Sequence, residues 1–210
     1  MAVTTHAGLF ITLEGGEGAG KSTAAAGLSA RLRAEGYEVV QTREPGGTAG
    51  AEAIRALLLS TDTALEPMAQ TFLHFAARAD HIARLIHPAL LRGAVVICDR
   101  FYDSTMAYQS YGLGVDRGAV DSMIRLINLR PDLTFMLQVP ENISKERLAS
   151  RGAASDRYED MGCEVMARIT RGFAAIAAAE PDRCALIDAT QTPEAVVDEM
   201  RRIVQARCGR

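Results

Sequence analysis

The sequence lacks an excess of basic residues: its 210 residues include 23 Lys and Arg against 26 Asp and Glu, a formal net charge of −3. A broad nucleic-acid-binding surface is therefore not expected, and any phosphate must be bound locally. Long apolar runs are missing too, since stretches such as Leu9–Leu13 and Ala94–Cys98 are far shorter than a membrane span. The first residues lack the basic start and apolar run of a signal peptide. We expect a cytoplasmic protein that binds neither nucleic acid nor membranes.

Cysteine is scarce, and its spacing argues against two further classes of site. Cys98, Cys163, Cys184 and Cys208 form no C-x-x-C pair and join no histidine cluster at zinc-ligand spacing. Without an export signal the thiols are expected to be reduced, and two of them lie in apolar runs where cysteine behaves as a small hydrophobic residue. Neither a zinc site nor a redox centre is expected.

Internal repeats, Ser/Gly-rich linkers and blocks of like charge are also missing. Apolar residues make up 48% of the chain and charged residues 23%, as in an ordinary globular domain. We therefore predict a single domain over residues 1–210. Within it, Arg151–Glu159 is small, polar and charged between two helical patterns, which predicts a mobile segment at about residues 150–160.

Short apolar runs alternate with longer helical patterns, an order typical of an α/β fold built from βαβ units. Helices are predicted over Ser22–Glu35, over Pro67–Leu91 and from Pro193 onward, and Pro88 is expected to kink or end the second. Five runs are apolar at nearly every position, as in strands buried on both faces: Leu9–Glu14, Tyr37–Thr42, Ala94–Asp99, Leu133–Val139 and Cys184–Asp188. We predict a three-layer sandwich, with a five-stranded parallel sheet and helices on both faces.

The first predicted strand runs directly into the pattern G-x-x-x-x-G-K-[ST], a P-loop, which is followed by a predicted helix, so the predicted three-layer sandwich is of the P-loop NTPase class. In a P-loop, backbone N–H groups surround phosphates at the helix N-terminus, Lys21 reaches the β and γ oxygens, and Ser22 supplies a magnesium ligand. The pattern predicts a nucleoside triphosphate that binds together with Mg²⁺. The residues expected to bind the nucleotide are Gly15, Gly16, Glu17, Gly18, Ala19, Gly20, Lys21, Ser22 and Thr23.

A second phosphate site is indicated at the same edge of the predicted sheet. Asp99 ends an apolar strand and is expected to help hold the metal, and Arg100 follows as a bidentate phosphate ligand. The loop Arg43–Thr48 follows the second strand and opens at the same carboxyl edge. His74 and Arg78, spaced i, i+4 on the next helix, share one face and can present a ring and a hydrogen-bonding fork to a base.

These motifs resemble the thymidylate kinase family along essentially the whole chain. The resemblance implies an enzyme that phosphorylates dTMP to dTDP with ATP in dTTP synthesis, and a homodimer formed through helix packing. It rests on Glu14–Thr23, Thr42–Thr48, Phe75–Arg78, Asp99–Arg100, Ser104–Gln109, Arg130–Leu133, Arg151–Gly152, Asp156–Arg157 and Ile187–Gln191.

The resemblance also implies roles for individual residues of the acceptor site. Glu17 matches an acid that meets the acceptor's 3′-hydroxyl, Arg100 an arginine that grips its phosphate, and Arg78 one that hydrogen-bonds thymine. Thr105 matches a polar residue at the base edge, and Tyr108 a tyrosine that disfavours a 2′-hydroxyl. The acceptor site implied in this way is Glu17, Arg43, Pro45, His74, Phe75, Arg78, Arg100, Ser104, Thr105, Tyr108 and Gln109.

The catalytic groups follow from the same resemblance. The P-loop carries Glu17-Gly18 rather than an arginine, as in the bacterial type, whose catalytic arginine comes from a lid. Arg151 and Arg157 are the lid candidates, beside Lys21 and Arg100. No general base is required, because a monophosphate with a second pKa of about 6 is mostly a dianion at neutral pH.

One position departs from the family pattern. Four residues before Arg78, where the family usually has a phenylalanine that stacks on thymine, this chain has His74, followed by Phe75. Either ring remains a candidate, and the helix register favours His74, with Phe75 turned toward the core. An imidazole with the ordinary pKa of about 6.5 would make dTMP binding sensitive to pH in that range.

Two other functions remain open. A kinase acting on another nucleotide or on a nucleoside is the nearer alternative, and a nucleoside kinase needs a carboxylate to receive a hydroxyl proton, for which Glu44 is the candidate. A P-loop switch that hydrolyses its nucleotide slowly is the other. The sequence lacks the N-K-x-D guanine-reading motif, which disfavours the switch.

Overall fold

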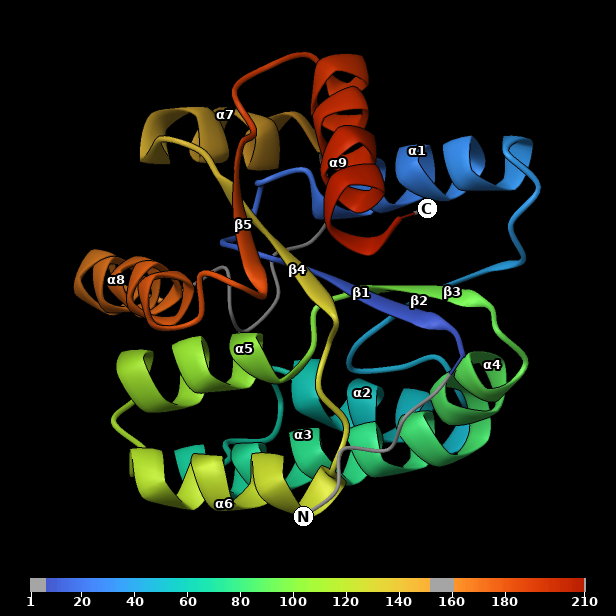
Figure 1. Cartoon of the computed structure of the whole chain (residues 1–210). Helices are drawn as coiled ribbons and strands as arrows, with labels where there is room; N and C mark the ends of the chain where they lie inside the picture. The colour runs from blue at the N-terminus through green and yellow to red at the C-terminus, as the bar shows by residue number, and fades with distance from the viewer. Residues whose placement is uncertain (1–6, 152–160, 210) are drawn as a thin grey trace.

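A computed structural model describes residues 7–151 and 161–209 of the chain as a sheet between layers of helices (Figure 1). Five parallel strands form the sheet in the order β2-β3-β1-β4-β5. The strands are β1 (Leu9–Glu14), β2 (Val39–Arg43), β3 (Val95–Asp99), β4 (Leu133–Gln138) and β5 (Cys184–Asp188). The predicted α/β architecture is confirmed.

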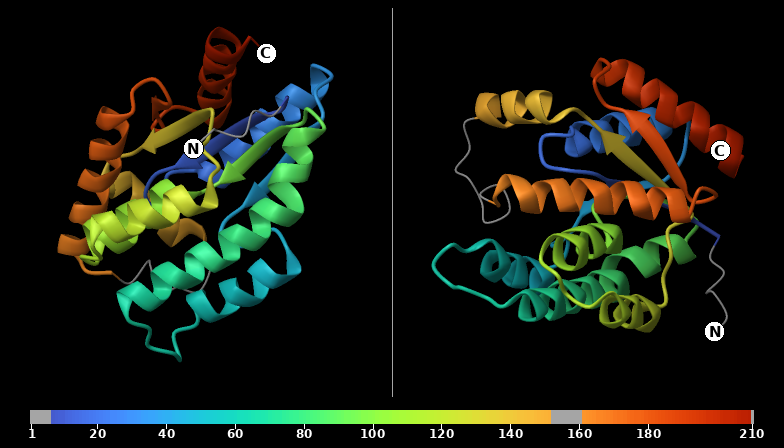
Figure 2. Two further views of the ribbon diagram at one scale, coloured as in Figure 1. Left: turned by 60° about the horizontal axis from the view of Figure 1, so that its bottom comes forward. Right: turned by 90° about the vertical axis from the view of Figure 1, so that its left-hand side faces the viewer.

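Two groups of helices cover the sheet (Figures 1 and 2). On one face lie α1 (Lys21–Ala34) and α9 (Pro193–Cys208), which pack on each other, with α7 (Glu141–Arg151) on the same side. The helical segments on the other side are α2 (Ala49–Leu59), α3 (Pro67–His81), η1 (Ile82–Ile86), α4 (His87–Leu91), α5 (Tyr102–Thr105), η2 (Met106–Gly112), α6 (Arg117–Ile127) and α8 (Cys163–Ala179), of which η1 and η2 are π-helical.

The side chains of β1 alternate between two halves of the core. Ile11 packs with Leu28 of α1 and Met200 of α9, and all three are fully buried. Phe10 points to the opposite face, where its ring meets Phe101 edge-to-face at 4.9 Å between centroids. Because both faces of this central strand are buried, its sequence is apolar at successive positions.

The edge strand β2 departs from the prediction. It begins at Val39 rather than Tyr37, and its residues are half-buried or exposed instead of buried on both faces. An edge strand has a neighbour on one side, so less of its surface is covered. The ends predicted at Ala94 and Val139 differ from the observed ends by one residue each.

The predicted helix over Pro67–Leu91 is helical throughout, but its winding changes before Pro88. The π-turn Ile82–Ile86 precedes the proline, and the N–H of His87 is bonded to the carbonyl oxygen of Ile82. Proline has no N–H to complete a regular ladder, and the wider turn carries the chain past it into α4. The expected irregularity at Pro88 is therefore a π-turn.

Candidate active site

The P-loop connects β1 to α1 at the carboxyl edge of the sheet. Gly15 has a φ of 134°, and a Cβ there would lie 2.4 Å from the carbonyl oxygen of Leu137, so the turn requires glycine. Gly20 caps α1 in the left-handed conformation, and Lys21 Nζ donates across the loop to the carbonyl oxygen of Gly16 at 2.7 Å. The loop thus sets a helix N-terminus and a lysine beside each other, an arrangement that suits anions.

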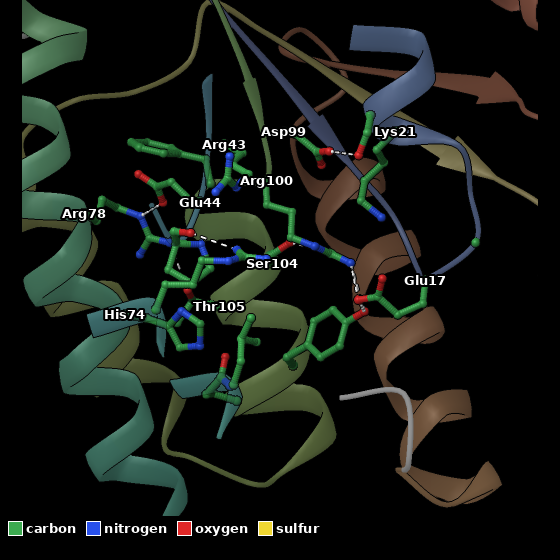
Figure 3. Close-up of a pocket in the computed structure, with 18 of the residues that line it drawn as sticks. Glu17, Lys21, Arg43, Glu44, His74, Arg78, Asp99, Arg100, Ser104 and Thr105 are labelled. Atoms are coloured by element: carbon green, nitrogen blue, oxygen red, sulfur yellow. Dashed lines mark hydrogen bonds and ion pairs between the residues drawn. The ribbon is translucent and has the colours of Figure 1, made fainter. Parts of the chain in front are cut away.

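A first cavity of about 240 Å³ opens in front of the P-loop, where the segments that follow β1, β2 and β3 meet residues of α2, α3, α5 and η2 (Figure 3). Segments far apart in the sequence converge there, as the predicted site requires. The predicted residues that line it are Glu17, Gly18, Gly20, Lys21, Ser22, Thr23, Arg43, Pro45, His74, Arg78, Asp99, Arg100, Ser104, Thr105, Tyr108 and Gln109.

Arg100 reaches into this cavity from the end of β3 (Figure 3). Its φ of 70° is left-handed, which costs a residue other than glycine about 1–3 kcal/mol. Nη1 donates to the carbonyl oxygen of Gly15 at 3.1 Å and to Ser104 Oγ at 2.9 Å, while Nη2 pairs with Glu17 and donates to Tyr108 Oη at 3.3 Å. Burial opposes the charge, but the carboxylate of Glu17 raises the net pKa of Arg100, so the guanidinium stays cationic.

Two oxygen atoms of a kind that binds Mg²⁺ and a lysine with a lowered pKa lie at the mouth of the P-loop. Ser22 Oγ donates to Asp99 Oδ2 at 2.6 Å, and hydroxyl and carboxylate oxygens are the ligands that Mg²⁺ prefers. Burial and the nearby charge of Arg100 lower the pKa of Lys21 to about 8, although the carboxylates of Glu17 and Asp99 oppose this shift. Lys21 is therefore mostly cationic at pH 7.

Arg78 and Glu44 form a buried ion pair in the wall of the first cavity. Arg78 Nε donates to Glu44 Oε2 at 2.7 Å, and Nη2 donates to Thr105 Oγ1 at 3.1 Å. The other oxygen of Glu44 lies 3.0 Å from His81 Nδ1. Both oxygens of Glu44 are thus engaged with nitrogen groups, so the carboxylate is poorly suited to receive a proton from a nucleoside hydroxyl.

A second cavity of about 280 Å³ lies on the other side of the P-loop. Arg147 of α7 contributes to it and donates from Nη2 to the carbonyl oxygen of Ala189 at 2.8 Å. Ser144 of the same helix donates to the carbonyl oxygen of Glu17 at 2.7 Å. The two cavities share the P-loop residues Gly18, Gly20 and Thr23 as lining.

Comparisons with known proteins identify the family to which the chain belongs. The family profile for thymidylate kinase matches residues 13–200. The chain belongs to the thymidylate kinase family. It is 52% identical to a thymidylate kinase of Gluconobacter oxydans over 193 residues, 90% of each chain, and 44% identical to one of Caulobacter vibrioides over 205 residues, 96% of this chain and 98% of that protein. A crystal structure of thymidylate kinase from Ehrlichia chaffeensis matches with a TM-score of 0.78 and 35% identity, covering 94% of this chain and 99% of that one.

Membership in the thymidylate kinase family makes this protein a nucleoside monophosphate kinase, as the resemblance predicted. At the position of the family's stacking residue, His74 lines the first cavity, while Phe75 is 7% exposed and lies in the core with the guanidinium of Arg78 4.8 Å from its ring centre. Burial, reinforced by Arg78 and Arg100, lowers the pKa of His74 to about 3. The expected titration of this ring near pH 6.5 is therefore wrong, because the cavity disfavours a further cation.

Glu14, which the sequence analysis did not single out, is fully buried and contacts two residues that line the first cavity. Its Oε1 accepts the N–H of Phe101 at 2.7 Å, and its Oε2 accepts the hydroxyl of Ser104 at 2.6 Å. Burial and the neighbouring Asp103 raise its pKa to about 8. Through its two hydrogen bonds, Glu14 links β1 to the segment that carries Arg100. An acid at the end of an apolar strand was the available signal.

Two arginines that line the cavities were not singled out by the sequence analysis, and two predicted lid arginines lie outside the described side chains. Arg55 of α2 lines the first cavity and donates to the carbonyl oxygen of Pro45 at 2.9 Å, and Arg147 lines the second. Neither stands in a motif. Arg157 lies outside the described residues, as does the side chain of Arg151 at the end of α7.

Proposed function

We propose that this protein transfers the γ-phosphoryl group of ATP to dTMP, which forms ADP and dTDP for dTTP synthesis. The observation that carries the proposal is a pair of buried donors in the first cavity: Arg78 Nη1 and Gln109 Nε2 have no hydrogen-bond partner among the described residues. A buried donor without a partner costs about 1–3 kcal/mol, so a ligand that brings oxygen acceptors to this wall is favoured. The carbonyl groups of thymine supply such oxygens.

The acceptor phosphate is proposed to bind at Arg100. At neutral pH the phosphate is already nucleophilic, and its attack requires positive charge to offset the repulsion between two phosphates. Arg100 supplies a fixed cation there, because Ser104 and the carbonyl oxygen of Gly15 orient its guanidinium. Glu17 and Tyr108 flank the same guanidinium and are proposed to contact the sugar.

ATP is proposed to bind across the P-loop, with its phosphates at Lys21 and its base in the second cavity beside Arg147. The oxygens of Ser22 and Asp99 suit Mg²⁺, and these two residues would hold it. The ion would screen the charge of the donor phosphates. Lys21 remains mostly cationic at pH 7 and adds its charge to that of Arg100.

A lid arginine is proposed to complete the site, as the family resemblance implies. Arg157 is the first candidate and Arg151 the second, because α7 leads from the P-loop contact of Ser144 directly into this segment. An arginine that arrives with the lid would add charge at the transferred group.

We further propose a homodimer that packs through α2, α3 and α6. Leu57 of α2, Phe72 of α3 and Leu126 of α6 are exposed by 40%, 58% and 81%. These three helices are neighbours on the side of the sheet away from α1 and α9 (Figure 1). Large exposed apolar side chains on adjacent helices favour a protein contact. Sedimentation should give twice the monomer mass, and a monomer at all concentrations would exclude the dimer.

A cytoplasmic location completes the proposal. Cys98, Cys163 and Cys184 carry free thiols, which are typical of a reducing compartment. Among the described residues, no helix is both long and apolar enough to cross a membrane.

An acceptor panel with ATP and Mg²⁺ tests the proposed function. dTMP should have the highest kcat/KM in a set that includes AMP, CMP, GMP and dCMP, and dTDP should form in step with ADP. A higher kcat/KM for AMP, CMP or GMP would refute dTMP as the substrate. Release of inorganic phosphate without dTDP would instead favour the nucleotide switch.

A further inference from the structure

A chain of hydrogen bonds runs behind Arg78 through the core to β2. Glu44 joins Arg78 to His81 Nδ1, and the other ring nitrogen, Nε2, lies 2.7 Å from Thr42 Oγ1. His81 is fully buried, and Arg78 and Glu44 are 2% and 5% exposed. At its other end the chain reaches α5 through Thr105. One polar chain therefore links β2, α3 and α5 and includes Glu44, Arg78 and Thr105 of the cavity wall.

The chemistry of the partners sets the direction of the bonds. An ionised carboxylate accepts hydrogen bonds and cannot donate them. Glu44 accepts from Arg78 Nε, and it therefore also accepts from His81, so Nδ1 of this ring carries a hydrogen. Two donors on its two oxygens fix the plane of the Glu44 carboxylate, whereas one donor would leave it able to turn.

The loop after β2 holds the ring of His81 in place. A Cβ on Gly47 would lie 2.5 Å from His81 Nε2 and 2.6 Å from Thr42 Oγ1, so the glycine backbone packs directly on this pair. Gly47 has a φ of 87°, a conformation that favours glycine. The imidazole therefore has little room to swing away from Glu44.

We propose that His81 is a positioning residue for the choice of acceptor base. By donating from Nδ1, it fixes the carboxylate that orients the guanidinium of Arg78. The inference rests on the proposed function, in which Arg78 reads the base. The donors of Arg78 favour a carbonyl oxygen, which uracil and thymine carry where cytosine carries an amino group. Loss of the hydrogen bond from His81 to Glu44 should weaken the preference for uracil and thymine over cytosine without affecting the P-loop.

Two substitutions of His81 separate its two bonds. In His81→Asn the amide nitrogen can occupy the position of Nδ1 and keep the bond to Glu44. In His81→Gln the amide reaches the position of Nε2 and keeps the contact with Thr42. The measured quantity is the ratio of kcat/KM for dUMP to kcat/KM for dCMP, because these acceptors differ at the group read by Arg78.

His81→Gln should lower this ratio about tenfold, the factor that corresponds to about 1.4 kcal/mol. It should also raise the KM for dTMP while the KM for ATP stays unchanged. His81→Asn should keep the ratio near that of the wild type. Equal ratios in the two variants, or a larger loss in His81→Asn, would overturn the inference.

Met200→Ala is the matched control for lost stability. Met200 is fully buried in α9 on the opposite face of the sheet. Its substitution should leave the dUMP to dCMP ratio unchanged, and a loss equal to that of His81→Gln would overturn the assigned role.

The wild-type protein supplies a test that needs no variant to fold. The ¹⁵N spectrum of His81 should show a hydrogen on Nδ1, and a ring protonated at Nε2 alone would overturn the inference. A wild type that fails to phosphorylate dTMP would refute the proposed function and this inference with it. An active wild type whose ratio both His81 variants leave unchanged would refute the role of His81 alone.

Discussion

The two sides of the P-loop are built differently. In the first cavity, charged side chains are paired with one another: Arg100 with Glu17, and Arg78 with Glu44. Lys21, on the P-loop side of the same cavity, and Arg147 of the second cavity donate to backbone carbonyl oxygens instead. Paired side chains can distinguish one ligand from another, whereas the backbone N–H groups of a P-loop suit the phosphates that all nucleotides share. The contrast predicts that substitutions on the acceptor side alter substrate choice, and that those at the transferred phosphate alter turnover.

The largest effect is expected at Arg157, the first candidate for the proposed lid arginine. If Arg157 contacts the phosphoryl group during its transfer, Arg157→Ala should lower kcat by on the order of 10³-fold or more, with little change in the affinity for dTMP. Arg157→Lys should not restore the rate, because the bidentate geometry is lost. Single-turnover rates of both variants test this. A near-normal kcat would remove Arg157 from the mechanism and move the role to Arg151.

A smaller effect, confined to the acceptor, is expected at Arg78. Arg78→Lys keeps the charge beside Glu44 but loses the fork that also reaches Thr105. The kcat/KM for dTMP should fall by about ten- to a hundredfold, the effect of losing one or two hydrogen bonds to a charged group. The KM for ATP should stay the same. A matching rise in the KM for ATP would contradict the separation of the two sides.

The pH dependence of kcat/KM for ATP tests the role of Lys21 on the P-loop separately from the acceptor side. With a pKa of about 8, Lys21 is cationic below that pH and loses its charge above it, so kcat/KM for ATP should fall as the pH rises through 8. The fall should approach about tenfold per pH unit. Lys21→Arg stays charged and should lack the fall, even if it is slower throughout. A wild-type profile that stays flat well above pH 8 would show that the charge of Lys21 is not needed.

The smallest effect is expected at His74. His74→Ala should weaken dTMP binding several-fold, since an aromatic stack contributes about 0.5–1.5 kcal/mol, and His74→Phe should retain or improve it. Because the pKa of His74 is about 3, its ring does not titrate near pH 6.5, so the wild type and His74→Phe should show the same change in KM there, which comes from the dTMP phosphate. Phe75→Ala is the control and should mainly lower stability. Normal binding by His74→Ala, with lost affinity in folded Phe75→Ala, would identify Phe75 as the stacking ring.

The sequence predicted the elements that depend on local pattern. Five apolar runs became five strands, and the P-loop appeared where its glycines and lysine indicated. Helix register also distinguished His74, on the cavity wall, from Phe75 in the core. These features follow from the spacing of residues along the chain, which periodicity can detect.

The features of the candidate site that the sequence did not predict depend on contacts between distant segments of the chain. Glu44, a candidate base in the sequence, is held by Arg78 and His81, 34 and 37 residues away along the chain. The left-handed backbone of Arg100 and the place of Arg55 in the cavity have no local signal either. Such roles arise only when the sheet brings its strand ends together, so a motif search does not find them.

Titration calorimetry of the nucleotide-free protein tests the central claim, that the first cavity is already organised to select dTMP. The paired side chains predict that dTMP binds in the absence of ATP, at least about tenfold more tightly than dCMP, since one hydrogen-bonded group distinguishes the two bases at Arg78. Equal affinities for dTMP and dCMP, or no binding of dTMP until the P-loop is filled, would contradict it.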